Sequence, residues 1–255
     1  MSVSEMIHRE LHGAVAVLRM ERGKVNALDV ELCEALISAL DEEAKGSAGA
    51  VVLTGAGRSF SAGVDLRRLL DGGEAYVSRF LPLLDAVFRA ALDFPKPLIA
   101  AMNGHAIAGG CILAACCDHR ILVKGWPRMG VTELAVGVPF PALPLAVVAA
   151  RCAPTALREL VYGAQAIPAE EALAAGLCDE LCEVDHVLTR ALTVARKRAE
   201  LPARAYALTR RAMAEPIYDM ARRQAAIDDD AKAAWMSSET TRAIQGYLDS
   251  LAAKR

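Results

Sequence analysis

The sequence predicts an α/β fold with a helical C-terminal part. Two observations predict it: up to about residue 143 short apolar runs alternate with segments of helical spacing, and beyond that point helical patterns follow one another. Strands joined through helices pair in parallel with right-handed crossovers. We therefore expect an α/β core over residues 1–195 and a helical region over residues 196–255.

The first elements are a strand, a helix and a second strand. Residues 14–20 and 50–54 are rich in valine and leucine and are bounded by glycine, which is typical of buried strands. Between them, residues 29–44 have apolar residues at helical spacing. Asp29 is the expected N-cap of this helix and Gly46 its stop.

The middle of the chain adds two more strand candidates, at residues 98–102 and 120–123. Helical spacing then predominates, at residues 143–152, 154–162, 168–175 and over most of the chain from residue 185.

Composition excludes several classes of function. The 255 residues carry 29 lysines and arginines against 31 aspartates and glutamates, so no strong positive field would attract nucleic acid. Apolar residues make up 54%, but no uninterrupted stretch approaches the roughly 20 residues that cross a bilayer. The N-terminal residues have no signal-peptide core. Seven scattered cysteines without a CxxC pair fit free thiols in the cytoplasm, with no zinc site.

Residues 55–66 (GAGRSFSAGVDL) form the first motif with chemical potential. The segment follows an expected strand and precedes an expected helix. Small residues at Ser61, Ala62 and Gly63 allow a ligand close to the backbone. A helix that begins near Val64 would direct free N–H groups at a polarised carbonyl. Taken alone, the segment is more simply interpreted as an ordinary strand–turn–helix connection.

Residues 103–111 (NGHAIAGGC) repeat this arrangement after the next buried strand. Glycines again stand where an apolar helix begins. Two such turns at neighbouring strand ends would face one pocket, and two backbone N–H groups on one carbonyl oxygen form an oxyanion hole. The spacing matches neither a phosphate loop nor a dinucleotide-binding motif.

Together these segments resemble the crotonase family, also called the enoyl-CoA hydratase/isomerase superfamily. The resemblance rests on Asn26-Ala27-Leu28, on SAGVDL at 61–66, and on PKPLIAAMNG at 95–104 continuing to Gly109-Gly110-Cys111. It implies a spiral of ββα turns, C-terminal helices that form a homotrimer or a dimer of trimers, and a coenzyme A thioester as the substrate. No cofactor and no metal is implied.

The resemblance also implies residue roles. The oxyanion donors fall on the N–H groups of Val64 and Gly109. The expected CoA-binding residues are Lys24, Val25, Ala27, Ser61, Ala62, Gly63, Asp65, Leu66, Arg67 and Gly110; for Arg67 a simple surface charge is an equal alternative. The expected acyl-pocket residues are His105, Ile112 and Phe140, with pocket depth set by the helix around residues 75–88.

The number of catalytic acids distinguishes water addition from double-bond isomerisation. Hydratases of this family hold water between two glutamates. Here the first of those positions is Ile112, and only the second matches a glutamate, Glu133. One carboxylate suits a proton shuttle that converts a 3-enoyl-CoA into a 2-enoyl-CoA. The Pro139-Phe140 pair is also nearer to the Δ3-Δ2 enoyl-CoA isomerase branch.

Three alternatives stay open at this point. A second acid from Asp71 or Glu74 would restore a hydratase or another crotonase-type lyase. A chain that has lost the chemistry would be a non-catalytic acyl-CoA binder, although the retained Glu133 argues against that. An RNA-binding relative is disfavoured by the acidic charge balance.

Overall fold

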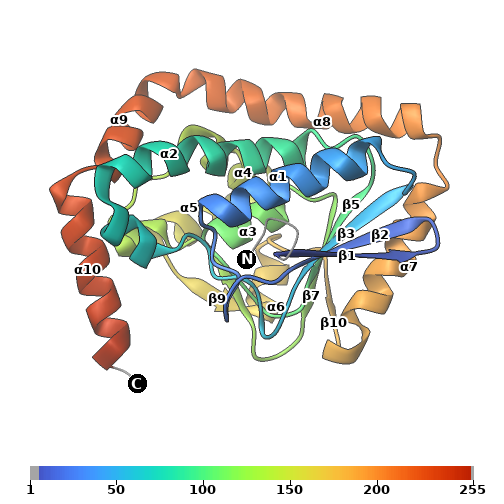
Figure 1. The fold of residues 1–255 in the computed structure, drawn as a ribbon, viewed down its shortest axis with the longest axis horizontal. Helices are drawn as coiled ribbons and strands as arrows, with labels where there is room; N and C mark the ends of the chain where they lie inside the picture. Colours follow the sequence, from blue (N-terminus) through green and yellow to red (C-terminus); the bar gives the residue numbers. More distant parts are fainter. Residues whose placement is uncertain (1–5, 254–255) are drawn as a thin grey trace.

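The computed structural model describes residues 6–253 and shows a mixed α/β fold built on two sheets (Figure 1). The larger sheet has six strands in the order β1-β2-β3-β5-β7-β10. Only the β1–β2 pair is antiparallel; every other pairing in this sheet is parallel. The bounds are β1 Ile7–His12, β2 Val15–Met20, β3 Ala50–Gly55, β5 Leu98–Met102, β7 His119–Val123 and β10 Glu180–Cys182.

The smaller sheet has the order β4-β6-β8-β9, with bounds β4 Ser59–Ser61, β6 His105–Ile107, β8 Arg128–Gly130 and β9 Ala166–Pro168. Its first three strands are parallel, and each follows directly after a strand of the larger sheet. A helix then follows each of them, which produces the expected ββα repeat. Because parallel strands end at one edge of a sheet, the segments that follow β4, β6 and β8 meet there.

The helices are α1 Val30–Lys45, α2 Leu66–Leu92, α3 Gly109–Ala115, α4 Ala142–Arg151, α5 Pro154–Gly163, α6 Ala169–Ala174, α7 Val187–Ala199, α8 Ala203–Arg223, α9 Ala225–Trp235 and α10 Ser238–Ala253, with 3₁₀ turns η2 Glu133–Val136 and η3 Val184–His186. Asp29 is confirmed as the N-cap of α1, because its Oδ1 accepts from the Leu32 N–H at 2.8 Å. Gly46 is confirmed at the other end.

Strand β1 and the three-residue strands of the smaller sheet were not expected from the sequence. The β1 sequence IHRELH exposes four of its six side chains at the edge of the sheet, so it lacks an apolar run. The strands β4 and β6 lie inside the glycine-rich motifs, and these two strands and β8 are too short for an alternating pattern to show.

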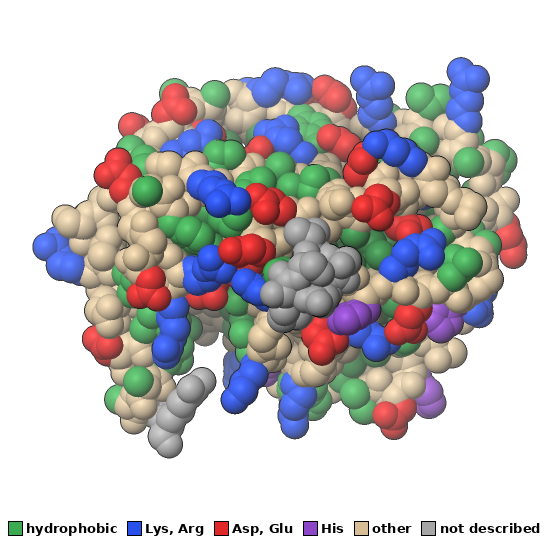
Figure 2. All heavy atoms as spheres, viewed as in Figure 1, with side chains coloured by type: hydrophobic (Ala, Val, Ile, Leu, Met, Phe, Trp, Pro, Cys, Tyr) green, Lys and Arg blue, Asp and Glu red, His purple; other side chains and the backbone are tan. Residues whose placement is uncertain are grey.

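Helices cover both faces of the larger sheet. The long α1 and α2 lie on one face, and α7 packs on the other through Val187, Ala191 and Ala195. Helix α8 then runs back along α2, and α9 and α10 descend at the far end (Figure 1). None of the helices within residues 6–253 is long and apolar enough to cross a membrane. Both signs of charge alternate over the face in Figure 2, in keeping with the near-zero net charge.

Candidate functional site

Two backbone N–H groups without acceptors mark one side of the site. The Leu28 N–H donates to Gly63 O at 2.7 Å, and the Asp65 N–H donates to Leu28 O at 2.9 Å, so the N–H of Val64 between them takes no part in this bridge. Gly109 opens α3, where a helix leaves its first N–H groups unpaired. No acceptor within residues 6–253 meets the N–H of Val64 or of Gly109.

Glycines bring these two groups together. Gly63 has φ +82°, and a Cβ added there would lie 2.8 Å from Ile107 O and 3.2 Å from Gly109 N. A Cβ on Gly110 would lie 2.4 Å from Ser61 O. The two motifs therefore pack backbone against backbone, which any side chain at these positions would prevent.

Asn26 holds the segment beside them. It is buried with φ +51°, its Oδ1 accepts from the Arg22 N–H at 2.9 Å, and its Nδ2 donates to Ser59 O at 2.9 Å. The Ser61 hydroxyl donates to Asn26 O at 2.7 Å. Asn26 thus connects the 22–28 loop to β4 by hydrogen bonds, which explains the asparagine of the Asn-Ala-Leu motif.

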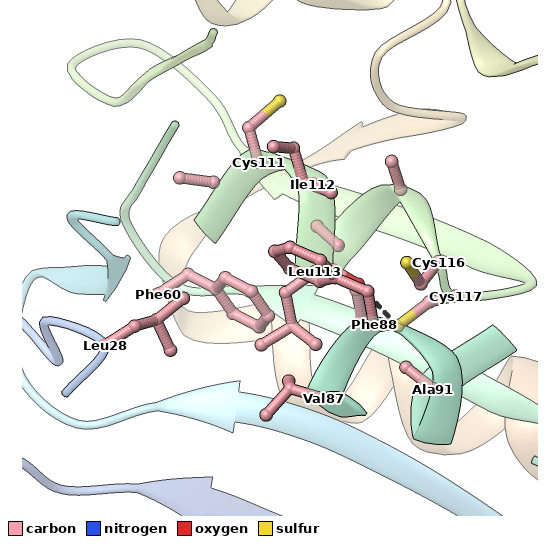
Figure 3. Close-up of a cluster of buried hydrophobic side chains, with 14 of the residues drawn as sticks. Leu28, Phe60, Val87, Phe88, Ala91, Cys111, Ile112, Leu113, Cys116 and Cys117 are labelled. Carbon is pink, nitrogen blue, oxygen red and sulfur yellow. Dashed lines mark hydrogen bonds between the residues drawn. The ribbon is translucent and has the colours of Figure 1, made fainter. Parts of the chain in front are cut away.

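A cavity of about 90 Å³ lies in front of both N–H groups. Val64, Gly109, Ile112 and Phe140 all line it, as expected. Its remaining walls are mostly apolar and are Ala62, Leu66, Leu84, Phe88, Ile107, Ala108, Thr132, Glu133, Val136, Val138, Pro141, Pro144, Trp235 and Tyr247. Phe88 and Ile112 extend this wall into the packed core around Leu113 (Figure 3).

His105 is not among the lining residues, contrary to expectation. Its Nδ1 accepts from the Arg128 N–H at 3.0 Å, and its ring meets Trp126 edge-on at 5.1 Å between centroids. The reason is the position of His105 along the strand. His105 is the first residue of β6, whereas the cavity lies at the other end, where Ile107 ends the strand and Ala108 follows it.

Glu133 supplies the acid of the site. It is the first residue of η2, its residue exposure is 7%, and its Oε2 is buried without a hydrogen-bond partner among the described residues. Burial raises the pKa of its carboxyl to about 7, and backbone N–H groups of Glu133 and Thr132 offset part of that rise. No other Asp or Glu of residues 6–253 lines the cavity.

Asp71 and Glu74 lie outside this cavity. Both are exposed on α2, on either side of a break at Gly73, where φ is +56° and ψ −154°. Neither lines the cavity wall. The second carboxylate that a hydratase needs is therefore not supplied by either of the two residues that the sequence offered.

The expected CoA-binding residues lie on the loop at 24–27, in the first motif and at the starts of α2 and α3, and we term their exposed members Lys24, Val25 and Arg67 the strip. The Ala62 N–H donates to Val25 O at 2.9 Å, which joins the exposed Lys24 and Val25 to the first motif. Asp65 is the N-cap of α2 and accepts from Arg67 N and Arg68 N, each at 3.1 Å. The remaining members are exposed Arg67, cavity-lining Leu66, half-buried Ala27 and buried Ser61, Gly63 and Gly110.

The C-terminal helices contact the segment that follows Glu133, on the acid side of the cavity. The Thr240 hydroxyl donates to Gly137 O and Trp235 Nε1 donates to Pro139 O, each at 3.0 Å. Asp228 accepts from the Ala142 N–H at 2.8 Å and so caps α4. Trp235 and Tyr247 reach the cavity from more than 90 residues beyond η2, and no local pattern in the sequence indicated that they would.

Comparison with known proteins places this site in a family. The family model described as enoyl-CoA hydratase/isomerase matches residues 10–254. A putative enoyl-CoA hydratase of Thermus thermophilus is 34% identical over 194 residues, 74% of this chain and 75% of that protein. The short-chain-enoyl-CoA hydratase of Clostridium acetobutylicum is 34% identical over 192 residues, 74% and 73% of the two chains.

Solved structures are also similar to this chain. A Mycobacterium tuberculosis protein, described as an enoyl-CoA isomerase in its apo structure and as a probable enoyl-CoA hydratase in a second structure, superposes with a TM-score of 0.79 at 33% identity, over 91% of this chain and 99% of that one. Human mitochondrial Δ3-Δ2-enoyl-CoA isomerase superposes with a TM-score of 0.91 at 24% identity, over 98% and 99%, which shows the shared fold. The chain belongs to the enoyl-CoA hydratase/isomerase family, the crotonase superfamily.

Proposed function

We propose that this chain is a Δ3-Δ2 enoyl-CoA isomerase that uses Glu133 as its single proton carrier. Glu133 takes a proton from C2 of a 3-enoyl-CoA, and the electrons of that C–H bond form the thioester enolate. The N–H groups of Val64 and Gly109 stabilise the enolate oxygen. Protonated Glu133 then returns the proton to C4, and the double bond comes to lie between C2 and C3.

One observation carries this proposal: Glu133 is the sole acid among the described residues of the cavity wall, and Ile112 also lines that wall. A water-adding enzyme needs a second group to hold and activate the water, and isoleucine does neither. A single buried carboxylate whose Oε2 has no partner is free to accept a proton at one carbon and release it at another.

The pKa of Glu133 suits both halves of the shuttle. A carboxyl with a pKa of about 7 exists in both protonation states near neutral pH, which favours proton transfer in each direction. The apolar wall that raises this pKa also strengthens the hydrogen bonds of the two N–H donors to a charged oxygen.

The test is the Glu133→Gln variant with a 3-enoyl-CoA substrate, followed by the absorbance of the conjugated thioester. We expect turnover to fall by about 10²–10⁴-fold, because glutamine keeps the shape but cannot carry the proton. Glu74→Gln is the matched control, since Glu74 is exposed and lies off the cavity, and it keeps wild-type turnover. Wild-type turnover in Glu133→Gln would contradict the proposal.

Hydratase activity is the second candidate, because the relatives from Thermus and Clostridium carry hydratase names. Ile112→Glu tests the difference between the two reactions. If one missing acid separates them, the variant adds water to crotonyl-CoA more than tenfold faster than the wild type. Efficient hydration by the unaltered chain would instead favour the hydratase.

Substrate binding and assembly complete the proposal. The CoA moiety runs along the strip from Lys24 to Arg67, with its phosphates near these two cations and its thioester at Val64. Lys24→Met and Arg67→Met then raise the KM for acyl-CoA with little change in kcat. A cytoplasmic homotrimer or dimer of trimers is the assembly we propose, and light scattering of the purified chain tests it.

A further inference from the structure

A second cavity of about 290 Å³ lies next to Asp118, the residue that precedes β7. It is enclosed by the end of α4, the end of α7 and the first half of α8. Its lining residues are Leu92, Cys116, Asp118, Arg151, Arg198, Leu201, Tyr206, Thr209, Arg210, Met213 and Ala214. Three guanidinium groups and one carboxylate therefore face the same space, and it shares no lining residue with the acyl-CoA cavity.

Arg210 and Asp118 satisfy each other and the backbone. Arg210 Nε donates to Asp118 Oδ1 at 2.6 Å, and its other nitrogens donate to carbonyl oxygens of Ala91, Leu92, Phe94 and Cys116. Asp118 Oδ2 accepts from the Leu98 N–H and from the Tyr206 hydroxyl, each at 2.9 Å. This buried pair holds α8 against the core and leaves no acceptor for another cation.

Neither Arg151 nor Arg198 forms a salt bridge with residues 6–253, and the nearby Asp118 pairs with Arg210. Arg151 makes one hydrogen bond, from Nε to Ala115 O at 2.9 Å, and its two terminal nitrogens are unpaired. Arg198 is half-buried and forms no ion pair with the described residues. Burial and the neighbouring cations Arg120 and Arg210 lower the pKa of Arg151 against the opposing effect of Asp118, so an anion at this point would further stabilise the charged guanidinium group.

We propose that this cavity is a binding site for a small phosphate-type oxyanion, held by the free guanidinium nitrogens of Arg151 and Arg198. A guanidinium group offers parallel N–H donors that match two oxygens of a phosphate. Thr209 lines the same space and adds a hydroxyl donor, whereas the hydroxyl proton of Tyr206 is already donated to Asp118. The shared chemistry is that of inorganic phosphate and of a phosphomonoester, and the size of the cavity accommodates either.

The experiment titrates the purified chain with inorganic phosphate by calorimetry, at constant ionic strength set with sodium chloride. A parallel titration uses glycerol 3-phosphate to separate a free phosphate site from a phosphomonoester site. We expect saturable binding of at least one of the two to the wild-type chain, and weakening by about tenfold or more in Arg151→Met. Arg204→Met, an exposed position on α8, keeps wild-type affinity.

Two further variants keep the result decisive. Arg198→Met removes a cation that makes no hydrogen bond to the described residues, so it weakens phosphate binding while the fold stays intact by circular dichroism. Arg67→Met removes a cation of the proposed CoA strip and leaves phosphate binding unchanged. Binding lost in Arg67→Met but kept in Arg151→Met, or no saturable binding to the wild-type chain, would overturn the proposal.

Discussion

The two sides of the cavity lined by Val64, Gly109 and Glu133 are built in opposite ways. The donor side, with Val64 and Gly109, is backbone held by backbone: its glycines touch neighbouring main-chain atoms, and buried Asn26 fastens it with side-chain hydrogen bonds. The acid side is a four-residue 3₁₀ turn that presents one buried carboxylate with an unpartnered oxygen. Helix α10 supports it from outside through Thr240.

This difference between the two sides separates the residues that affect both folding stability and turnover from the residue that affects them differently. On the donor side, the N–H groups of Val64 and Gly109 that the substrate would meet have no acceptor among residues 6–253. The acid side keeps a carboxylate in an apolar wall, which costs stability whenever that carboxylate is charged. Changes on the donor side therefore disturb folding and turnover together, whereas changes at the acid separate the two.

The largest effect expected from a change on the donor side is that of Gly63→Ala. Its Cβ would lie 2.8 Å from Ile107 O at a φ of +82°, so the two motifs must move apart and the donors lose their alignment. We expect kcat to fall by about 10²–10³-fold, with a lower Tm. Gly13→Ala is the control, since it has a φ of +68° but no atom within 4 Å. Equal turnover losses in both variants would show that backbone strain, and not the contact, matters.

Next in size is the effect of Glu133→Gln on stability. Because burial raises the folded-state pKa of Glu133 to about 7, the folded chain holds this proton more tightly than the unfolded chain does. The stability from the protonated form is complete below about pH 4.3 and is lost as pH rises through 7. Removing the charge should stabilise the chain by on the order of 2–3 kcal/mol at pH 8 and by little at pH 4.5.

Denaturant unfolding at these two pH values measures this difference. The exposed Glu74→Gln variant provides the baseline and should show no such pH dependence. If Glu133→Gln were less stable than the wild type at pH 8, the charged carboxylate would have to be well solvated. That result would contradict its burial on the acid side.

The pH dependence of turnover should be of moderate size. The free enzyme must hold Glu133 ionised to accept the C2 proton, so kcat/KM should rise about tenfold per pH unit up to about pH 7 and then level off. A plateau that already begins near pH 5 would place the carboxylate in a polar environment and would contradict the apolar wall.

The smallest expected effect is that of Thr240→Val. The variant removes the hydroxyl that donates to Gly137 O and so loosens η2 on α10, at a cost of about 1 kcal/mol. We expect a fall in kcat of a few fold with KM nearly unchanged. Thr241→Val removes an exposed hydroxyl bonded within its own helix and should leave kcat unaltered. Indistinguishable kinetics for the two variants would remove α10 from the support of the acid.

The donor side could be predicted from sequence because its information is local. Gly63 and Gly109 stand where strands end and helices begin, and the family resemblance assigned the donor role to the N–H groups of Val64 and Gly109, two residues that line the cavity. Glu133 could be found in the same way. Asp29 followed from capping chemistry alone, and its hydrogen bond to Leu32 bears that out.

The features that the sequence did not predict depend on the position of a residue within its strand and on packing between distant parts of the chain. His105 was expected in the acyl pocket because it lies inside the second motif, but it begins β6 and the cavity lies at the other end of that strand. Trp235 and Tyr247 reach the cavity only because α9 and α10 return to η2. The polar edge strand β1 has no apolar run that would have revealed it.

The most direct test of the single-acid account compares two rates of the unaltered chain: conversion of a 3-enoyl-CoA to the conjugated thioester, and addition of water to crotonyl-CoA. One acid and an isoleucine in the cavity wall predict that isomerisation is faster by about 10²-fold or more. Hydration as fast as isomerisation would contradict the account, because water would then be activated by a group other than Glu133 alone.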